Sequence, residues 1–423
     1  MRMEYDVIIV GARVAGSALA YELAGAGYEV LLLDRGTFPS DTLSTHNIYG
    51  NTVAMLKEMG VLDSLLATGT PVYRRAHMNF EGAVLDGRFP GTEEESGCLC
   101  VRRVYFDDVL FKHAKSQRGV TVLEGFRVTD LLRDGDVDTV TGVAGRYRSG
   151  DAGSFTAKLV VGADGRLSSI RKLAGSECLE RVPTDFASYV AYASGFAQEG
   201  ERHVEFYKKD DKWAIAFPTS DGQFVIGAMF PLNDEQWLGR FKENPEAGMR
   251  DLYEEGFSHT TLPARVRGAE FVGPVRGLLG YDNDFYRGMG KGWAVVGDAL
   301  SFKDPTIGQG MHDALFGART LAATLSEHKP DEWNDNWGPM GEWYQSAMEK
   351  KLMSRFRMGC QLTKNVPTPP ETVAAYRLIG ADEAATQTFF GTYNYKNEPD
   401  DIGPEIGRLL AAAASASGKV STT

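Results

Sequence analysis

The chain has 423 residues, 43% of them hydrophobic, which is more than one hydrophobic core usually supports and predicts two domains. Its formal net charge is −12, and it contains no block of Lys or Arg. Nucleic acids and anionic membranes are therefore unexpected partners, because phosphate groups are bound by clustered cations. A small neutral or apolar molecule is the expected substrate.

The cysteines indicate a reduced protein without a metal site. Cys98, Cys100, Cys178 and Cys360 show no spacing with His that would complete a zinc pattern. The apolar run at 7–10 ends at Gly11, so it predicts neither a signal peptide nor a membrane span. We expect a cytoplasmic protein, and the sequence does not predict its oligomeric state.

The first predicted unit is DVIIVGARVAGSALAYELAGAGYEVLLLDR at 6–35. It reads as an apolar strand, a glycine-bounded turn, an Ala-rich helix and a second strand that ends in an acid. Amides at the helix start would bind a pyrophosphate, and Asp34 is placed to accept hydrogen bonds from ribose hydroxyls. The ligand is expected to carry ADP. Arg13 replaces the middle glycine of G-x-G-x-x-G, and it either pairs with phosphate or turns to the surface.

Helices and short strands follow along the chain. Apolar spacing predicts helices over 51–66 and 107–114, and alternation with turns predicts an antiparallel meander whose last strand, 159–161, returns to the first sheet. A second sheet is predicted from the strands between Phe186 and Phe230, and a helix over 235–256. The nucleotide domain resumes near Gly292. Further helices are predicted over 340–362 and 371–390.

Two more turns carry polar groups after apolar strands. KLVVGADG leads into Asp164, whose alternative role is simply to cap the next helix. VVGDALSFKDPTIGQGM places Asp298 where it can bind a ribityl or phosphate-linked hydroxyl, and Gly308 to Gly310 begins a helix whose amides would face a developing negative charge. A capped helix is again the alternative.

GARVAG, the Asp164-Gly165 pair, and Gly297-Asp298 followed by DPTIGQG resemble the FAD-dependent group A monooxygenase family typified by para-hydroxybenzoate hydroxylase, over roughly residues 4 to 330. Flavin halogenases and geranylgeranyl-reductase-like flavoproteins are related to this family. The resemblance implies FAD, with its adenine end on the first unit and its isoalloxazine beside Pro305 to Met311. Arg103 matches a family arginine that contacts FAD, Arg102 is its neighbour, and Val128 lies where backbone groups meet adenine. The residues expected at FAD are Gly11, Ala12, Arg13, Ala15, Gly16, Asp34, Arg35, Arg102, Arg103, Val128, Asp164, Gly297, Asp298, Pro305, Gly308, Gln309, Gly310 and Met311.

The expected fold class is α/β, with a Rossmann-like FAD-binding domain interleaved with a mixed β-sheet substrate domain, plus C-terminal helices. The FAD-binding domain is expected to be discontinuous. The predicted ranges are 1–180 and 265–330 for the FAD-binding domain, 181–264 for the substrate-binding sheet, 331–410 for the C-terminal helical region and 411–423 for a flexible tail.

The resemblance implies a monooxygenase that uses NAD(P)H and O2 to hydroxylate or epoxidise a neutral or apolar aromatic or polyketide-like molecule through a flavin C4a-hydroperoxide. No second nucleotide fingerprint follows the first, so NAD(P)H is expected to bind only transiently. The sequence does not distinguish NADH from NADPH.

The predicted catalytic residues are Thr45 and His46, which align with the family segment that runs back towards the flavin ring. His46 would orient the substrate or donate a proton, and a purely structural histidine is the alternative. Alternation places Trp213, Ile215 and Phe217 on one face of a strand. This face either lines the substrate cavity or packs as sheet core on the 235–256 helix.

Three other functions remain as alternatives. A flavin halogenase is disfavoured because its W-x-W-x-I-P motif appears only as Trp213 to Pro218, without the second tryptophan and the isoleucine. A double-bond reductase, or saturase, is disfavoured because the family cysteine is absent from Phe38 to Thr42. A non-catalytic binding platform with this fold would have no reason to keep Asp298 and the GQG helix start.

Overall fold

The computed structural model describes residues 5–42, 44–135 and 138–420, of which 413–420 are described by their backbone alone. Its first sheet has the strand order β18-β19-β10-β1-β2-β7, parallel except for β18. The strands are β1 Tyr5–Val10, β2 Val30–Asp34, β7 Val120–Glu124, β10 Ala152–Gly162, β18 Met289–Gly290 and β19 Trp293–Val295. Val7, Ile8 and Ile9 are fully buried, as in a parallel sheet covered on both faces.

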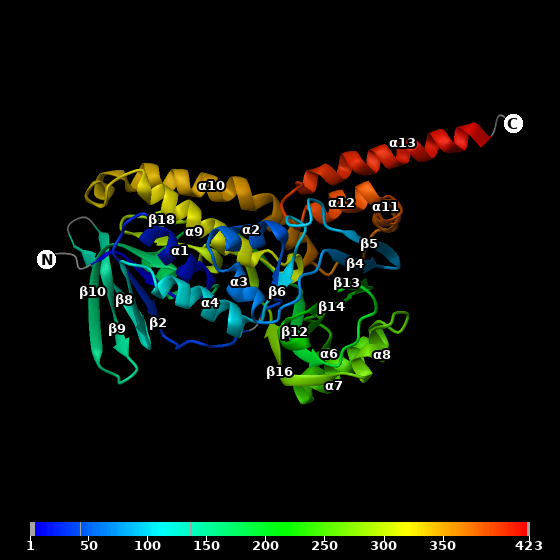
Figure 1. The fold of residues 1–423 in the computed structure, drawn as a ribbon, viewed down its shortest axis with the longest axis horizontal. Helices are drawn as coiled ribbons and strands as arrows, with labels where there is room; N and C mark the ends of the chain where they lie inside the picture. The colour runs from blue at the N-terminus through cyan, green and yellow to red at the C-terminus, as the bar shows by residue number, and fades with distance from the viewer. Residues whose placement is uncertain (1–4, 43, 136–137, 421–423) are drawn as a thin grey trace.

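Helices pack on this sheet and on one another. α1 (Val14–Gly25) connects β1 to β2, which confirms the predicted βαβ unit, and α4 (Arg103–Lys115) and α9 (Gly310–Ser326) pack against α1. α10 (Trp333–Leu362) lies along α9 (Figure 1). The helix predicted over 51–66 is two helices, α2 (Gly50–Glu58) and α3 (Leu62–Leu66). Gly60 has a φ of +79° between them, which α-helical backbone does not allow.

The predicted meander is confirmed. β8 (Phe126–Asp134) pairs antiparallel with β9 (Thr139–Tyr147), and β9 pairs antiparallel with the first half of β10. The second half of β10 then runs parallel to β1, so this long strand belongs to both the meander and the first sheet. α5 (Ser169–Ala174) follows it.

The second sheet has the order β16-β12-β15-β14-β13-β4-β5. Its strands are β4 Arg75–Phe80, β5 Ala83–Arg88, β12 Phe186–Ser194, β13 His203–Lys209, β14 Lys212–Pro218, β15 Phe224–Pro231 and β16 Glu270–Leu279. β4, β5 and β16 lie outside the 181–264 range expected for this sheet. β4 joins it by pairing in parallel with β13, and no local pattern encodes a pairing between segments so far apart.

Helices cover one face of the second sheet. They are α6 Glu235–Glu243, α7 Pro245–Gly256 and α8 Leu262–Arg267. The helix predicted over 235–256 is thus divided, because Asn244 caps a new helix that begins at Pro245: its Oδ1 accepts a hydrogen bond from the Ala247 amide at 3.1 Å. Ala214 and Ala216 face these helices in one buried cluster.

The C-terminal region is helical. It comprises α11 Pro370–Gly380, α12 Glu383–Gly391 and α13 Ile402–Val420, and α11 and α12 pack on β5. The flexible tail expected over 411–423 is instead helical as far as Val420, since alanine has the highest helix propensity, and 421–423 lie outside the described residues. Figure 1 shows α13 extending away from the body of the molecule.

Short strands complete the fold. β3 (Asn47–Ile48) pairs with β6 (Leu99–Cys100), and β11 (Cys178–Pro183), β17 (Asp282–Tyr286) and β20 (Ser301–Phe302) form a separate small sheet. Every helix in the described part of the chain falls short of the length or apolar character that a membrane span needs.

Candidate functional site

Three glycine-rich turns meet at the carboxyl ends of β1, β10 and β19, where Val10, Gly162 and Val295 lie in register. Gly11 has a φ of +106°, and a Cβ on it would lie 2.4 Å from the carbonyl oxygen of Ala163. A Cβ on Gly297 would lie 2.8 Å from the Cβ of Ala15. The turns predicted from distant parts of the sequence are therefore in contact, at the edge where open α/β sheets bind ligands.

Gly11→Ala is expected to destabilise the protein by about 2 kcal/mol more than Gly27→Ala, measured by denaturant unfolding. Both glycines have positive φ, so both variants carry the strain of a left-handed alanine. Only at Gly11 does the added Cβ meet backbone, because nothing lies within 4 Å of a Cβ on Gly27. Equal losses of stability would contradict the close approach of the two turns.

Asp34 lies beside the first turn, as predicted. Its Oδ2 accepts a hydrogen bond from the Ala12 amide at 2.8 Å, and its Oδ1 accepts one from Gly36 at 2.7 Å. Arg35, next to it, is exposed. A Cβ on Gly16 would lie 1.7 Å from the Gly11 carbonyl oxygen, so this glycine allows α1 to pack close to the turn.

Arg13 contacts protein groups at the start of α1. It forms an ion pair with Asp107, and its Nη2 donates to Ser40 Oγ at 3.0 Å. Asp107 is fully buried and also accepts hydrogen bonds from Arg103 at 2.7 and 3.0 Å. Two guanidinium groups thus share one carboxylate and leave one net positive charge beside the helix N-terminus, where a pyrophosphate would bind.

Two residues that were predicted to contact the cofactor have a place in the protein structure itself. The Asp164 carboxylate accepts hydrogen bonds from the amides of Ser169 at 2.6 Å and Ile170 at 3.2 Å, so it caps α5, as in the alternative interpretation. Val128 lies in β8, with its side chain buried.

The Asp298 carboxylate lies at the centre of the converging turns. It is partly buried, and among the described residues no group donates a hydrogen bond to it. Burial raises its pKa to about 6, although the nearby charge of Arg103 acts in the opposite direction. A Cβ on Gly310 would lie 3.9 Å from Asp298 Oδ1, so the start of α9 adjoins it. The Asp298 carboxylate can therefore accept a hydrogen bond from a hydroxyl group of a ligand.

More unpartnered polar atoms lie beside Gly308, which has a φ of +64° after the turn Pro305–Ile307. Asn47 Nδ2, a donor 3.4 Å from where a Gly308 Cβ would lie, and Gln309 Oε1, an acceptor, are both buried without a partner in the described part of the chain. Met311 follows in the first turn of α9, partly buried. A flavin presents both donors and acceptors along its pyrimidine ring, so these residues fit it.

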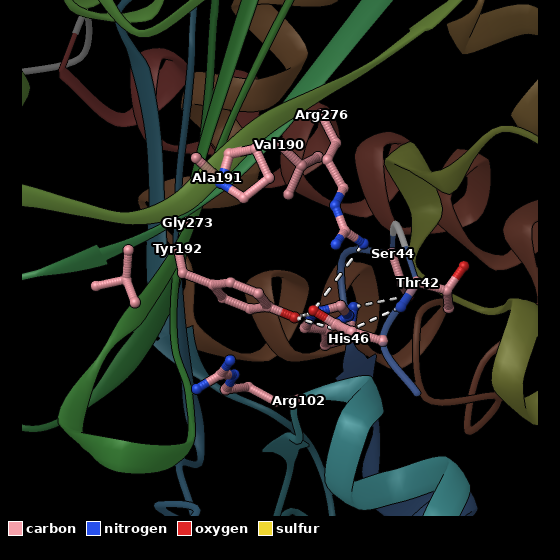
Figure 2. Close-up of a pocket in the computed structure, with 12 residues that line it drawn as sticks. Thr42, Ser44, His46, Arg102, Val190, Ala191, Tyr192, Gly273 and Arg276 are labelled. Atoms are coloured by element: carbon pink, nitrogen blue, oxygen red, sulfur yellow. Dashed lines mark hydrogen bonds and ion pairs between the residues drawn. The ribbon is translucent and has the colours of Figure 1, made fainter. Parts of the chain in front are cut away.

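A cavity of about 160 Å³ opens between residues 41–42 and 44–46, β12 and β16 (Figure 2). Its lining residues are Asp41, Thr42, Ser44, His46, Arg102, Val190, Ala191, Tyr192, Val272, Gly273, Pro274 and Arg276. His46 Nε2 and the Tyr192 hydroxyl are 2.5 Å apart, and the same hydroxyl lies 3.3 Å from Asp41 Oδ1. His46 Nδ1 is buried and has no partner among the described residues.

Charges around the cavity keep His46 neutral. Burial, together with Arg103, Arg102 and Arg276, lowers the pKa of His46 well below its ordinary value. Burial and Asp41 raise the pKa of Tyr192. The cavity therefore presents a neutral imidazole at physiological pH, joined to a protonated tyrosine.

The arginines of the cavity are paired with acids. Arg102 donates to Asp221 Oδ2 at 2.8 Å and lies 4.4 Å from the ring centre of Tyr192, and Arg276 lies 4.0 Å from Asp41 Oδ2. Arg102, expected at FAD, is thus part of the cavity wall in this structure. Sequence reasoning did not identify Tyr192, Arg276 or Asn47. Alternation along β12 marks Tyr192 and Val190 as one face, but no sequence signal singles out Arg276.

The other residues predicted for catalysis or for lining the substrate cavity, Thr45, Trp213, Ile215 and Phe217, do not line this cavity. Thr45 lies next to His46, and its carbonyl oxygen accepts a weak hydrogen bond from Cys100 Sγ at 3.5 Å. Trp213, Ile215 and Phe217 share one face, as predicted, but they pack in the cluster with the C-terminal helices. The alternative, that this face packs on the 235–256 helices, was wrong, because the alanine face of β14 lies there.

Comparison with known proteins places residues 4–336 in the family described as FAD binding domain. A 1H-pyrrole-2-carbonyl-[peptidyl-carrier protein] brominase of Pseudoalteromonas luteoviolacea is 23% identical, over 82% of this chain and 83% of its own. A kynurenine 3-monooxygenase of Salinispora tropica is 25% identical, over 78% and 74%. A digeranylgeranylglycerophospholipid reductase 2 of Methanothermobacter thermautotrophicus is 29% identical, over 77% and 78%.

Proposed function

The chain belongs to the FAD binding domain family of flavin-dependent oxidoreductases, and we propose that it is a monooxygenase acting on a small aromatic hydroxy compound. Bound FAD would supply the activation of O2, after reduction by NAD(P)H. The observation that carries the proposal is Asp298, a partly buried carboxylate that accepts no hydrogen bond from the described residues and lies where three glycine turns meet. The turn at Gly308, which borders Asn47, follows a short way along the chain. His46, the neighbour of Asn47, lines the cavity.

The protein groups have separable tasks in this proposal. Asp34 and Asp298 would accept hydrogen bonds from hydroxyls of the cofactor, while Arg13 and Arg103 would neutralise its phosphates. The first amides of α9 would stabilise negative charge on the flavin ring. None of these tasks requires a metal, and the described residues contain no cluster of His, Cys, Asp or Glu suited to one.

The cavity supports a substrate with one aromatic ring. Its volume of about 160 Å³ is close to the roughly 150 Å³ of an engineered protein cavity that binds benzene. Val190, Ala191 and Pro274 offer an apolar wall, and the hydrogen-bonded pair of His46 and Tyr192 offers a polar group for a ring hydroxyl. The acids beside Arg102 and Arg276 leave the cavity with little net charge, which favours a neutral compound.

Halogenase and reductase chemistry is found among the relatives, and sequence and structure favour oxygenation over both. The halogenase motif is incomplete, and its one matching tryptophan, Trp213, packs edge-on against Phe80, with ring centres 5.8 Å apart, in a buried cluster. The cysteine of the reductase family is absent from Phe38 to Thr42, where the Ser40 hydroxyl accepts a hydrogen bond from Arg13.

Turnover with isotopically labelled O2 tests the proposal. Purified protein is expected to be yellow with bound FAD, to oxidise NADH or NADPH, and to transfer label from O2, but not from labelled water, to a one-ring phenol. Runs with and without bromide and chloride, and anaerobic runs with an alkene, serve as controls. A halogenated product or alkene reduction without O2 would contradict the monooxygenase proposal.

A further inference from the structure

The segment Gly391–Glu398, between α12 and α13, lies against the start of α9. Gln309, which is buried at the N-terminus of α9, donates hydrogen bonds from its side-chain amide to the carbonyl oxygens of Thr392 and Tyr393, both at 3.1 Å. Its donors are thus directed to the C-terminal segment, and only its Oε1 is left without a partner among the described residues. One residue of the predicted flavin turn therefore holds the C-terminal region.

Tyr395 makes a second connection, one turn further along α9. Its hydroxyl donates to Asp313 Oδ1 at 2.5 Å, and its ring stacks on the imidazole of His312 with ring centres 3.8 Å apart. The guanidinium of Arg355 lies 4.0 Å from the same ring. Tyr395 has a φ of +61°, a backbone strain that the surrounding contacts must hold in place.

Asp313 extends this connection to the turn that precedes α9. The carboxylate is buried and also binds Lys303, two residues before Pro305, and His312 Nδ1 at 3.0 Å. Lys303 holds the pKa of Asp313 well below its usual range, although burial alone would raise it. The negative charge of Asp313 in turn raises the pKa of Asp298. Tyr395, Asp313 and Lys303 thus form a continuous set of polar contacts from the C-terminal segment to the turn before α9.

Arg355, fully buried in α10, holds the other end of the segment. It donates to Glu398 Oε2 and to the Asn397 carbonyl oxygen, each at 2.7 Å, and to the Thr392 carbonyl oxygen at 3.3 Å. A buried guanidinium with this many partners is costly to displace. The segment is thus held rigidly between α9 and α10.

We propose that the segment Gly391–Glu398 belongs to the flavin site, with Gln309 and Tyr395 as positioning residues that set the first turn of α9 for the bound isoalloxazine. This inference rests on the proposed binding of FAD. Neither residue needs to touch a substrate for this role. The C-terminal region would then determine the affinity for FAD and the electronic state of the flavin.

The test compares Tyr395→Phe with Tyr376→Phe, in full-length protein. Tyr376, in α11, is a matched control because its hydroxyl makes no hydrogen bond with the described residues, and its ring packs on Phe80 and Phe389. We expect Tyr395→Phe to raise the Kd of apoprotein for FAD severalfold, because the first turn of α9 is then less well ordered before FAD binds, and to shift the flavin absorption maximum and midpoint potential. Tyr376→Phe should change none of the three.

Gln309→Met, which keeps the side-chain length but removes both donors, provides a second variant in case Tyr395→Phe does not fold. It too is expected to weaken FAD binding severalfold, because the carbonyl groups of Thr392 and Tyr393 then no longer hold the start of α9. A lower melting temperature with unchanged FAD affinity, spectrum and potential in these variants would show a purely structural role and overturn the inference. Wild-type protein that binds no FAD would overturn the proposed function, and this inference with it.

Discussion

His46→Gln is expected to lower kcat/KM by about 10² to 10⁴-fold while FAD binding persists, because the variant loses a neutral imidazole that can exchange a proton with a substrate hydroxyl. His46 is buried, joined to Tyr192 at 2.5 Å and otherwise unpartnered at Nδ1 within the described chain. The measurement is steady-state kinetics with the one-ring phenol identified by the labelling experiment.

His113→Gln is the matched control for this variant. His113 also has a ring nitrogen buried without a partner in the described residues, but it lies in α4, against Tyr21, and does not line the cavity. It should retain activity within about threefold. Equal losses in the two histidine variants would indicate a general effect on folding and contradict a role of His46 in turnover.

The pH dependence gives a separate test of the same residue. Since the folded-state pKa of His46 is depressed, the unfolded chain takes up a proton near pH 6.5 that the folded protein does not. The free energy of unfolding should therefore fall as pH decreases below about 6.5, and it should fall less steeply in His46→Gln. Parallel stability curves for the two proteins would mean that folding does not lower the pKa of His46.

Asp298→Ala is expected to raise the Kd for FAD by about tenfold to hundredfold, since each hydrogen bond to a charged acceptor contributes about 1.5 to 3 kcal/mol. Titration of apoprotein with FAD, followed by flavin fluorescence, measures the effect. Unchanged affinity would contradict the role assigned to this carboxylate.

Asp298→Asn should at the same time stabilise the apoprotein. The pKa of Asp298 is raised from 3.8 to about 6, so its ionised form is disfavoured in the folded state, and stability is lost as pH rises from about 4 to 6. A shift of this size corresponds to at most about 3 kcal/mol. The variant should be more stable than wild type at pH 8 and equal to it below pH 4, as expected where a binding site carries an unfavourable charge.

Much of the FAD-binding unit could be predicted because its signals are local. The strand, turn and helix of 6–35 follow from apolar runs, from glycine at a positive φ and from an acid at a strand end, and each needs only its own neighbours in the chain. The face shared by Trp213, Ile215 and Phe217 was predicted for the same reason, since alternation is a property of a single strand.

Contacts between residues that lie far apart in the chain could not be predicted in this way. The sequence left open whether Arg13 binds phosphate or points outward, and the structure directs it to Asp107, 94 residues later in the chain. Gln309 was expected at FAD, but the sequence did not predict that its side-chain amide donates to carbonyl groups of the C-terminal segment. Such pairs are decided by which surfaces pack together, and packing has no short-range pattern.

The sequence by itself determined the βαβ unit, the three glycine turns and the candidate acids Asp34 and Asp298, because backbone conformation and the alternation of apolar residues depend on nearest neighbours. Only the tertiary structure decided that β4 and β5 join the second sheet, that Tyr192 and Arg276 complete the cavity around His46, and that Tyr395 reaches the first turns of α9. Those contacts join residues far apart in the chain, and they form only when whole helices and sheets bury their apolar faces against one another.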